Sequence, residues 1–293
     1  MIIVQFHGGL GNQMFQYIFY TELKKKYPNI TIKADLDCYI YERYKVHNGF
    51  ELDRIFNNIK LDIATTEEIL SCDGSYERHK EGVVDIIKKM FFNTRQKMRI
   101  KIGMSKCVFE KDWNFYNDLS EEELISKNFW LSGYWANLNN RIIPEFEFKY
   151  ELDGLNLEYL KKMRSSNSVG IHVRRGDYVG TFLDVVGVDY YREAITFLMQ
   201  RYKDLVFYVF SDDKKYVEDI FAEYTNCTII ENNVGELSYI DMELMSNCKH
   251  NIICNSTFST WGALLNKNPE KVVIYPKPYL DNISFTEGEW IGI

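Results

Sequence analysis

Two adjacent arginines carry the strongest chemical signal in this sequence. The apolar run 168–173 is typical of a buried strand, and Arg174 and Arg175 follow it directly, just before a glycine turn. Because neighbouring strand residues point to opposite faces, the two side chains cannot simply form one solvated patch. Guanidinium groups at the carboxyl end of an α/β strand suit a phosphate or a carboxylate. An ion pair with Asp177 beside the turn is the simpler alternative.

A glycine-rich turn follows the first predicted strand, in the segment His7–Gln16. Such a turn lets backbone N–H groups approach an anionic ligand at the start of a helix. The spacing does not match the dinucleotide-binding pattern, because Met14 or Phe15 stands where a third glycine is needed. A tight turn with Asn12 as helix cap is the alternative. The predicted ligand contacts of this turn are Gly8, Gly9, Gly11 and Asn12.

Two further segments place polar groups after predicted strands. Asp212 and Asp213 follow the strand that ends at Phe210, where paired carboxylates suit Mg²⁺ beside a diphosphate. Alternatively, Ser211 caps a helix with an acidic first turn, or Asp212 contacts a purine base. The segment 254–262 is rich in hydroxyl and amide groups at a predicted helix start, which suits an anion better than a cap alone requires. Its predicted ligand contacts are Asn255, Ser256, Thr257, Phe258 and Ser259.

The elements that must position these residues alternate between strand and helix. The amino-terminal strand, helix and strand predict a parallel sheet, over residues 2–6, 12–27 and 30–34. From about residue 166, repeated β-α steps predict a doubly wound unit. Its strands are expected at 168–173, 205–210, 227–230, 250–254 and 271–275, and its helices at 189–203, 213–224, 236–247 and 258–267. We therefore expect an α/β protein with two lobes, 1–160 and 161–293.

Composition limits the classes of function. The chain has 293 residues, 46% of them hydrophobic and 26% charged, as in a soluble globular protein. A net charge of −7 argues against nucleic acid as a partner. The six cysteines are scattered and form no metal-ligand spacing with the five histidines, so we expect reduced thiols and no zinc site. With no leader before the first strand and no run of about 20 apolar residues, a cytoplasmic location is expected.

One basic segment stands apart from the acidic remainder. Residues 86–109 contain seven Lys or Arg and no acidic residue, and apolar side chains alternate with these charges. A basic amphipathic segment can lie on an anionic membrane surface. A solvated helix or hairpin that covers the core is the favoured alternative. Peripheral contact with the cytoplasmic membrane face is therefore kept as a second expectation.

Taken in order along the chain, the polar segments resemble the α-1,2-fucosyltransferases of glycosyltransferase family 11. The resemblance spans nearly the whole chain and is weakest over about 40–130. The amino-terminal turn and the His-x-Arg-Arg-Gly-Asp segment are the specific parts. One departure is Thr260, where many bacterial members carry a tryptophan next to Trp261, which affects the shape of the sugar pocket. The matching segments are His7–Tyr17, His172–Tyr178, Phe210–Asp213, Asp241–Ser246, Asn255–Gly262 and Glu289–Ile293.

The resemblance implies a GT-B architecture, in which two Rossmann-like lobes face a cleft. It places the acceptor side in residues 1–160 and the GDP-fucose site in 161–293. The implied reaction is an inverting transfer of L-fucose from GDP-fucose to O2 of a galactose-terminated oligosaccharide, carried on a lipid in one alternative, without a metal or other cofactor. Arg174 would meet the charge that develops on the leaving GDP. The further donor contacts implied are His172, Arg175 and Asp212.

The general base and the donor sugar stay open. Asp177, His7 and Asp184 are the candidates for the base, and a strongly oxocarbenium-like transition state would need none. Another GDP-linked deoxyhexose, such as GDP-colitose, is an alternative donor. A nucleotide-sugar-binding module without catalysis is a third alternative, which the intact Arg174, Arg175 and segment 255–259 disfavour.

Overall fold

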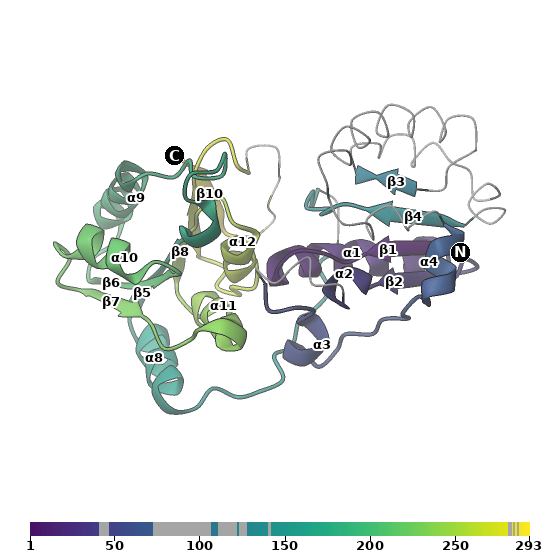
Figure 1. Cartoon of the computed structure of the whole chain (residues 1–293). Coiled ribbons are helices and arrows are strands. Elements are labelled where there is room, and N and C mark those ends of the chain that lie inside the picture. Colours follow the sequence, from purple (N-terminus) through teal and green to yellow (C-terminus); the bar gives the residue numbers. More distant parts are fainter. Residues whose placement is uncertain are drawn as a thin grey trace. The chain divides into compact units, whose positions relative to one another are not determined.

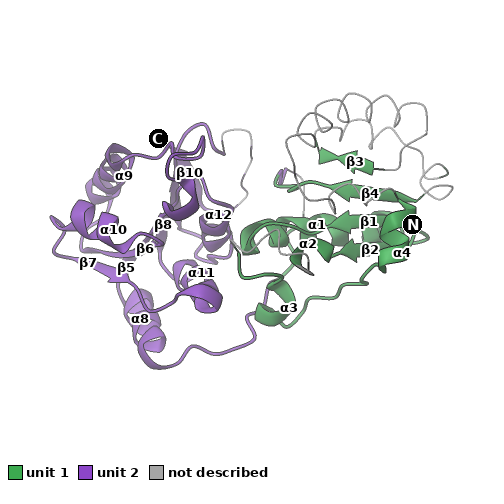
Figure 2. Ribbon diagram, in the orientation of Figure 1, with its two compact units in different colours: residues 1–136, 141–145 green, residues 137–140, 146–293 purple. Residues whose placement is uncertain are grey.

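The computed structural model describes residues 1–40, 47–72, 107–110, 122, 128–139, 142–280, 283, 285 and 287–293. The chain divides into two compact units, Met1–Ala136 with Arg141–Glu145, and Asn137–Asn140 with Phe146–Ile293 (Figure 2). The second unit begins before the boundary expected at 160/161, because helix α8 (Gly154–Ser165) contacts β5 and α11 of that unit. The functions expected of the two lobes stay predictions.

The first unit contains the predicted parallel sheet. Its strands lie in the order β2 (Ile32–Asp35), β1 (Ile2–Gln5), β4 (Phe129–Ser132) and β3 (Cys107–Phe109), and each pair is parallel. The predicted β-α-β opening is confirmed, with helix α1 at Leu10–Lys26. The described residues after β2 include the short helices α2 (Asp37–Ile40), α3 (Leu52–Ile55) and α4 (Thr66–Ser71).

The second unit is the predicted doubly wound unit. In its described residues the sheet order is β10-β9-β8-β5-β6-β7, with every pair parallel. Helices α9 and α10 cover one face of the sheet, and α8, α11 and α12 cover the other (Figure 1). The strands are β5 (Asn167–Val173), β6 (Leu205–Ser211), β7 (Cys227–Ile230), β8 (His250–Ile252), β9 (Val272–Tyr275) and β10 (Glu289–Gly292), and the helices are α9 (Val188–Arg201), α10 (Lys214–Phe221), α11 (Tyr239–Ser246) and α12 (Thr257–Leu264).

The order of these strands places a topological switch point between β5 and β8. The chain first builds outward from β5 through β6 to β7, and then returns to build β8, β9 and β10 on the other side of β5. This is the Rossmann strand order, in which ligands bind outside the carboxyl ends of the strands where the direction reverses. Residues that follow β5 and β8 are therefore the first candidates for a binding site.

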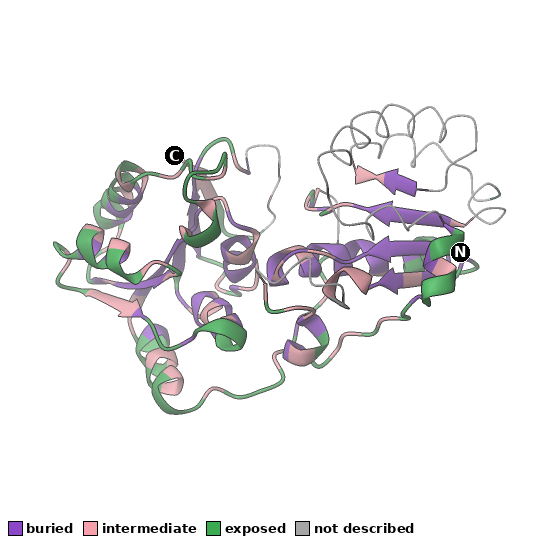
Figure 3. Ribbon diagram, viewed as in Figure 1, coloured by how far each residue is buried: buried purple, intermediate pink, exposed green. Residues whose placement is uncertain are grey.

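Apolar side chains explain why the central strands hold this sheet together. Both faces of a parallel sheet are covered, so its strands are continuous apolar runs, and β5, β6 and β8 are buried along most of their length (Figure 3). The core between the sheet and α9 and α10 includes Val169, Ile171, Val173, Tyr191, Leu198, Phe207, Val209 and Val217. Each fully buried aliphatic or aromatic side chain contributes about 1.5–3 kcal/mol, and this rigid base fixes the loops above it.

Two expectations concern membranes, and the structure describes only part of the residues on which they depend. Apart from residues 107–109, the basic segment 86–109 lies outside the described residues, so membrane contact through it stays a prediction. Among the helices that the structure describes, none has the length and apolar character needed to cross a bilayer.

Candidate functional site

The candidate site lies where β5 and β8 end, at the switch point. Arg174 follows Val173, the last residue of β5, and Asn255 lies shortly after β8. The two strand ends are joined by Tyr178, whose hydroxyl donates to the backbone oxygen of Asn255 at 3.3 Å. Burial raises the pKa of Tyr178 to about 12, so the hydroxyl keeps its proton and this link at neutral pH.

Arg174 is held between two carboxylates. Its Nε and one terminal nitrogen lie 2.9 and 2.7 Å from Asp177 Oδ1, and its other terminal nitrogen lies 3.0 Å from Asp212 Oδ2. The guanidinium also lies over the ring of Tyr178, 5.7 Å from the ring centre. The ion pair with Asp177 considered above is therefore present. It orients a planar donor group at the strand end and leaves the group partly exposed.

Arg175 has a different set of side-chain partners from Arg174. Its terminal nitrogen donates to Asp184 Oδ1 at 3.1 Å, and its guanidinium stacks over Tyr216 at 4.3 Å. Its Nε is buried 4.0 Å from Asp213 Oδ2 and has no hydrogen-bond partner within the described residues. Arg175 thus ties the loop that carries Asp184 to helix α10. Contact with a donor molecule stays a prediction for this residue.

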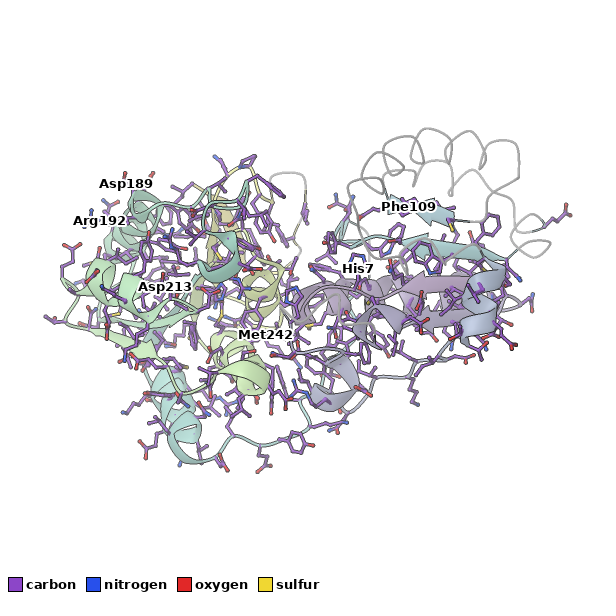
Figure 4. The ribbon with its side chains drawn as sticks, viewed as in Figure 1. His7, Phe109, Asp189, Arg192, Asp213 and Met242 are labelled. Atoms are coloured by element: carbon purple, nitrogen blue, oxygen red, sulfur yellow. The ribbon has the colours of Figure 1, made fainter. Side chains whose placement is uncertain are left out.

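The two aspartates after β6 perform different tasks. Asp212 accepts from Arg175 N at 2.8 Å through Oδ1 and pairs with Arg174 through Oδ2. A Cβ at Gly176 would lie 2.7 Å from Asp212 Oδ2, so only glycine allows this close approach. Asp213 is the N-cap of α10 and accepts from Tyr216 N at 3.1 Å (Figure 4). The expectation that Ser211 caps this helix is wrong, because its hydroxyl accepts from Asp213 N instead.

His172 is buried near the end of β5, two residues before Arg174. Its imidazole is buried, with Nδ1 3.2 Å from Cys254 Sγ and the ring 5.4 Å from the ring of Phe258. Burial first, and the neighbouring Arg174 charge second, lower the pKa of His172 to about 3. The side chain is therefore neutral and packs β5 against the loop after β8. Contact between His172 and a donor molecule stays a prediction.

Helix α12 begins at the segment rich in hydroxyl groups. Ser256 is its N-cap residue and makes no side-chain capping bond, while its carbonyl accepts from Thr260 N and from the Ser259 hydroxyl at 3.0 and 3.1 Å. The first-turn amides of Thr257 and Phe258 follow directly. At the other end of α12, the buried Lys271 donates to the carbonyl of Ala263 in the last turn and to that of Asn266 just beyond it, which complements the helix dipole. An anion at the N-terminus would gain from the same dipole.

The glycine-rich turn belongs to the first unit. Gly8 has φ +80°, and a Cβ there would lie 2.6 Å from Asn12 Nδ2, so the turn requires glycine. Helix α1 begins at Leu10 with Gly9 as its N-cap, so the alternative in which Asn12 caps the helix is wrong. His7 precedes the turn, and its ring lies 4.7 Å from that of Tyr134 (Figure 4).

Two glutamines that we did not single out from the sequence hold this turn in place. Gln16 accepts from His7 N at 3.0 Å and donates to His7 O at 3.2 Å. Gln13 donates to Gly8 O at 3.1 Å. Both side chains are fully buried, three residues apart on a largely apolar helix, and that spacing is the signal that could have identified them.

The structure thus gathers the predicted residues in two places. Arg174, Arg175, Asp177, Asp184 and Asp212 form one connected cluster in the second unit, next to the start of α12. The glycine turn, Asn12 and His7 lie in the first unit. In the part of the chain that the structure describes, no group of three His, Cys, Asp or Glu side chains is arranged to hold a metal ion.

A cluster of amide groups around Asp241 was also missed in the sequence. Asn233 donates to Asp241 Oδ1 at 2.7 Å, and Asn156 and Asn232 donate to Asn233 Oδ1 at 2.9 and 3.1 Å. The cluster lies beyond the end of β7, at the same carboxyl edge of the sheet as Arg174. Burial raises the pKa of Asp241 to about 7, although the bond from Asn233 opposes this rise. Asn156 is 77 residues from Asn233, so spacing in the sequence could not reveal their contact.

Asp241→Asn is expected to raise the melting temperature at pH 8 and to change it little at pH 4. The folded carboxyl keeps its proton up to about pH 7, while the unfolded one loses it near 3.8, so its contribution to the free energy of unfolding is present below pH 4 and lost as the pH rises through 7. Asparagine avoids that loss, so the variant should gain several degrees in melting temperature at pH 8. Scanning calorimetry at both pH values, with the exposed Asp219→Asn as control, measures it; equal destabilisation at both pH values would contradict the assignment.

Comparison with solved structures agrees with this fold. The bacterial fucosyltransferase NodZ from Bradyrhizobium, described as an α-1,6-fucosyltransferase and solved after soaking with GDP-fucose, superposes with a TM-score of 0.53 at 12% identity, covering 98% of this chain and 99% of NodZ. At that identity the likeness concerns the fold alone. The α/β fold class expected from the sequence is confirmed.

Relatives found by sequence are more informative than this structural neighbour, because their identity to the chain is higher. An O-antigen biosynthesis glycosyltransferase, WbnK, from Escherichia coli is 32% identical, covering 98% of both chains. An alpha-1,2-colitosyltransferase from Escherichia coli is also 32% identical, covering 96% of this chain and 93% of the relative. The family model described as glycosyl transferase family 11 matches residues 1–293. The chain therefore belongs to glycosyltransferase family 11.

Proposed function

We propose that this protein transfers L-fucose from GDP-fucose to O2 of a terminal galactose, with inversion at the fucose anomeric carbon. The observation that supports it best is the position of Arg174, a partly exposed arginine at the switch point of a Rossmann-like unit. A planar guanidinium can contact two oxygens of a diphosphate at once. Helix α12 follows β8, the strand next to β5, and the backbone amides at its start suit the same anion.

The proposed reaction needs positive groups that stabilise the negative charge developing on GDP. As the bond between fucose C1 and the β-phosphate oxygen breaks, its electron pair stays on GDP, and the galactose O2 forms the new bond to C1. Arg174 and the first-turn amides of α12 are fixed before the reaction and stabilise that charge. One preorganised donor of this kind is worth about 3 kcal/mol in the transition state.

We propose Asp177 as the base that accepts the proton from the galactose 2-hydroxyl. Asp177 binds Arg174 through Oδ1, and within the described residues its Oδ2 accepts no hydrogen bond. Asp184 differs, because Oδ1 accepts from Arg175 and Oδ2 from Gly180 N at 3.3 Å. The side chain of Asp177 is also the more exposed of the two, at 34% against 28%. Asp184 is better suited to hold its loop.

We expect GDP to raise the melting temperature equally with and without EDTA. Binding to the folded state alone stabilises it by about 2.7 kcal/mol when GDP is present at a hundred times its Kd. The arginines and helix amides supply positive groups from the protein itself, so the proposed site uses no metal. Differential scanning fluorimetry with GDP, GDP plus Mg²⁺ and GDP plus EDTA measures the shift. A shift that disappears on chelation would assign a metal to Asp212 and overturn the metal-free proposal.

A second donor is supported by the relative named alpha-1,2-colitosyltransferase. Colitose is fucose without its 3-hydroxyl group. A site that forms hydrogen bonds with that hydroxyl would reject the deoxy donor by about 10⁴-fold, whereas an apolar site would not reject it strongly. Rates with GDP-fucose and GDP-colitose, offered side by side with a panel of galactose-terminated oligosaccharides, decide between them. Binding of GDP without transfer or donor hydrolysis would leave only the binding module.

The location of the enzyme remains a proposal as well. We propose that it acts in the cytoplasm, because its cysteines are free in the described structure and nucleotide-sugar transfer is compatible with reduced thiols. A lipid-linked acceptor would place it at the cytoplasmic membrane face.

A further inference from the structure

Three apolar side chains are exposed on the loop that follows the arginines. Val179, Phe182 and Val185 lie between the short turn Gly176–Tyr178 and helix α9, and their exposed fractions are 50, 87 and 69%. A single exposed apolar residue is ordinary, but three within seven positions beside a candidate site are not. The fold gains almost nothing from the Phe182 ring, so its position calls for another explanation.

The loop is held firmly although its apolar side chains face outward. Asp184 accepts from Arg175 and from Gly180 N, and Thr181 Oγ1 donates to the carbonyl of Tyr178 at 2.7 Å. Leu183 N donates to Thr181 Oγ1 at 3.2 Å. Bonds of this kind on both sides of Phe182 fix the backbone on which the ring stands. A ligand that binds to the ring therefore meets a surface that is already ordered, which lowers the entropy cost of binding.

Both anchors of the loop come from the switch point. Arg175 leaves the end of β5, and Asn255, beyond the end of β8, donates from Nδ2 to Leu183 O at 2.9 Å. Phe182 is thus one residue away from a carbonyl that the candidate donor segment holds. The three apolar side chains therefore stand on a loop that is anchored at the candidate donor site.

We infer that Phe182, with Val179 and Val185 beside it, is the surface on which the acceptor galactose stacks. This inference rests on the proposed function, and it adds a contact from the second unit to the acceptor side that the resemblance places in residues 1–160. A pyranose has an apolar face of C–H groups and a polar edge of hydroxyls, and an aromatic ring presents a negative face that attracts such C–H groups. Stacking on Phe182 binds the apolar face and leaves the hydroxyl edge free for Asp177 and the donor.

The test compares Phe182→Ala and Phe182→Tyr with wild type in steady-state kinetics. GDP-fucose is the donor, and the acceptor is lactose or whichever galactose-terminated oligosaccharide of the panel the wild type uses. We expect Phe182→Ala to raise the acceptor KM about tenfold, the loss of one aromatic contact, and Phe182→Tyr to retain the wild-type value. The GDP-induced thermal shift and the hydrolysis of GDP-fucose without acceptor should not change. Met199→Ala, which removes an exposed apolar side chain from α9, is the matched control.

The outcomes separate this inference from the proposed function. Transfer by Phe182→Ala with an unchanged acceptor KM overturns the stacking surface alone. Equal loss of acceptor affinity and of the GDP shift also overturns it, because the loop would then act on the donor site. A wild-type chain that binds GDP but transfers to no acceptor of the panel overturns the proposed function, and the stacking surface with it.

Discussion

Arg174→Ala is expected to lower kcat by about 10²–10³-fold, the usual loss when one preorganised donor is removed from a developing negative charge. Arg174 is the arginine at the switch point, and Asp177 and Asp212 fix its guanidinium at 2.7–3.0 Å. Arg174→Lys should recover little of this loss, because lysine keeps the charge and lacks the planar pair of donors. Transfer from GDP-fucose, measured at saturating donor, checks the expectation.

The control for this variant is Arg192→Ala. Arg192 lies on α9 and pairs with Glu223 at 3.4 Å, with both side chains more than half exposed. Its removal should leave kcat unchanged and the melting temperature nearly so, since exposed pairs contribute about 0–1 kcal/mol. A near-wild-type rate in Arg174→Lys would reduce Arg174 to a source of positive potential, and a specific contact with the leaving group would have to be abandoned.

Asp177→Asn is expected to lower kcat by about 10²–10⁴-fold, the range that a positioned base contributes. Asparagine can still accept the bond from Arg174 through its carbonyl oxygen, so the arginine should stay in place and GDP should bind as before. Transfer rates at saturating donor and acceptor and the GDP thermal shift are the measurements.

Asp184→Asn distinguishes the two carboxylates. Asp184 bonds Arg175 and Gly180 N and carries the Phe182 loop, so its amide variant should raise the acceptor KM more than it lowers kcat. If Asp184→Asn lowers kcat by about 10²-fold or more and Asp177→Asn does not, the roles are reversed. If neither variant lowers kcat to that extent, either His7 is the base or the reaction uses none.

The elements around the site were predictable where one local signal decided them. The apolar run 168–173 specifies a strand, because a parallel strand must be apolar on both faces. The tail strand β10 was not expected, because Glu289–Gly292 is short, partly exposed and lies at the sheet edge, where burial does not constrain the pattern. Ser and Asp are both common helix caps, so the choice of Asp213 over Ser211 depends on backbone angles that the sequence does not specify.

The contacts within the site were less predictable than its membership. The Arg-Arg-Gly-Asp segment and the Ser/Thr-rich segment both lie at the switch point, as the order of strands required. What sequence spacing did not reveal is that Asp212, from the next strand, pairs with Arg174 and that Asn255 holds the loop at Leu183. Such partners come together when separate strands pack side by side, and residue spacing in the sequence does not give the distance between them.

Under the proposed reaction, release of GDP is eased by the carboxylates that surround Arg174. The guanidinium already contacts Asp177 and Asp212 in the free protein, so a diphosphate binds by exchange of one anion for another. The same exchange runs backwards when the product leaves, because both carboxylates are fixed within reach and take the guanidinium back. Arg174 can therefore contact the leaving group strongly while the bond breaks without retaining the finished nucleotide with the full strength of that contact.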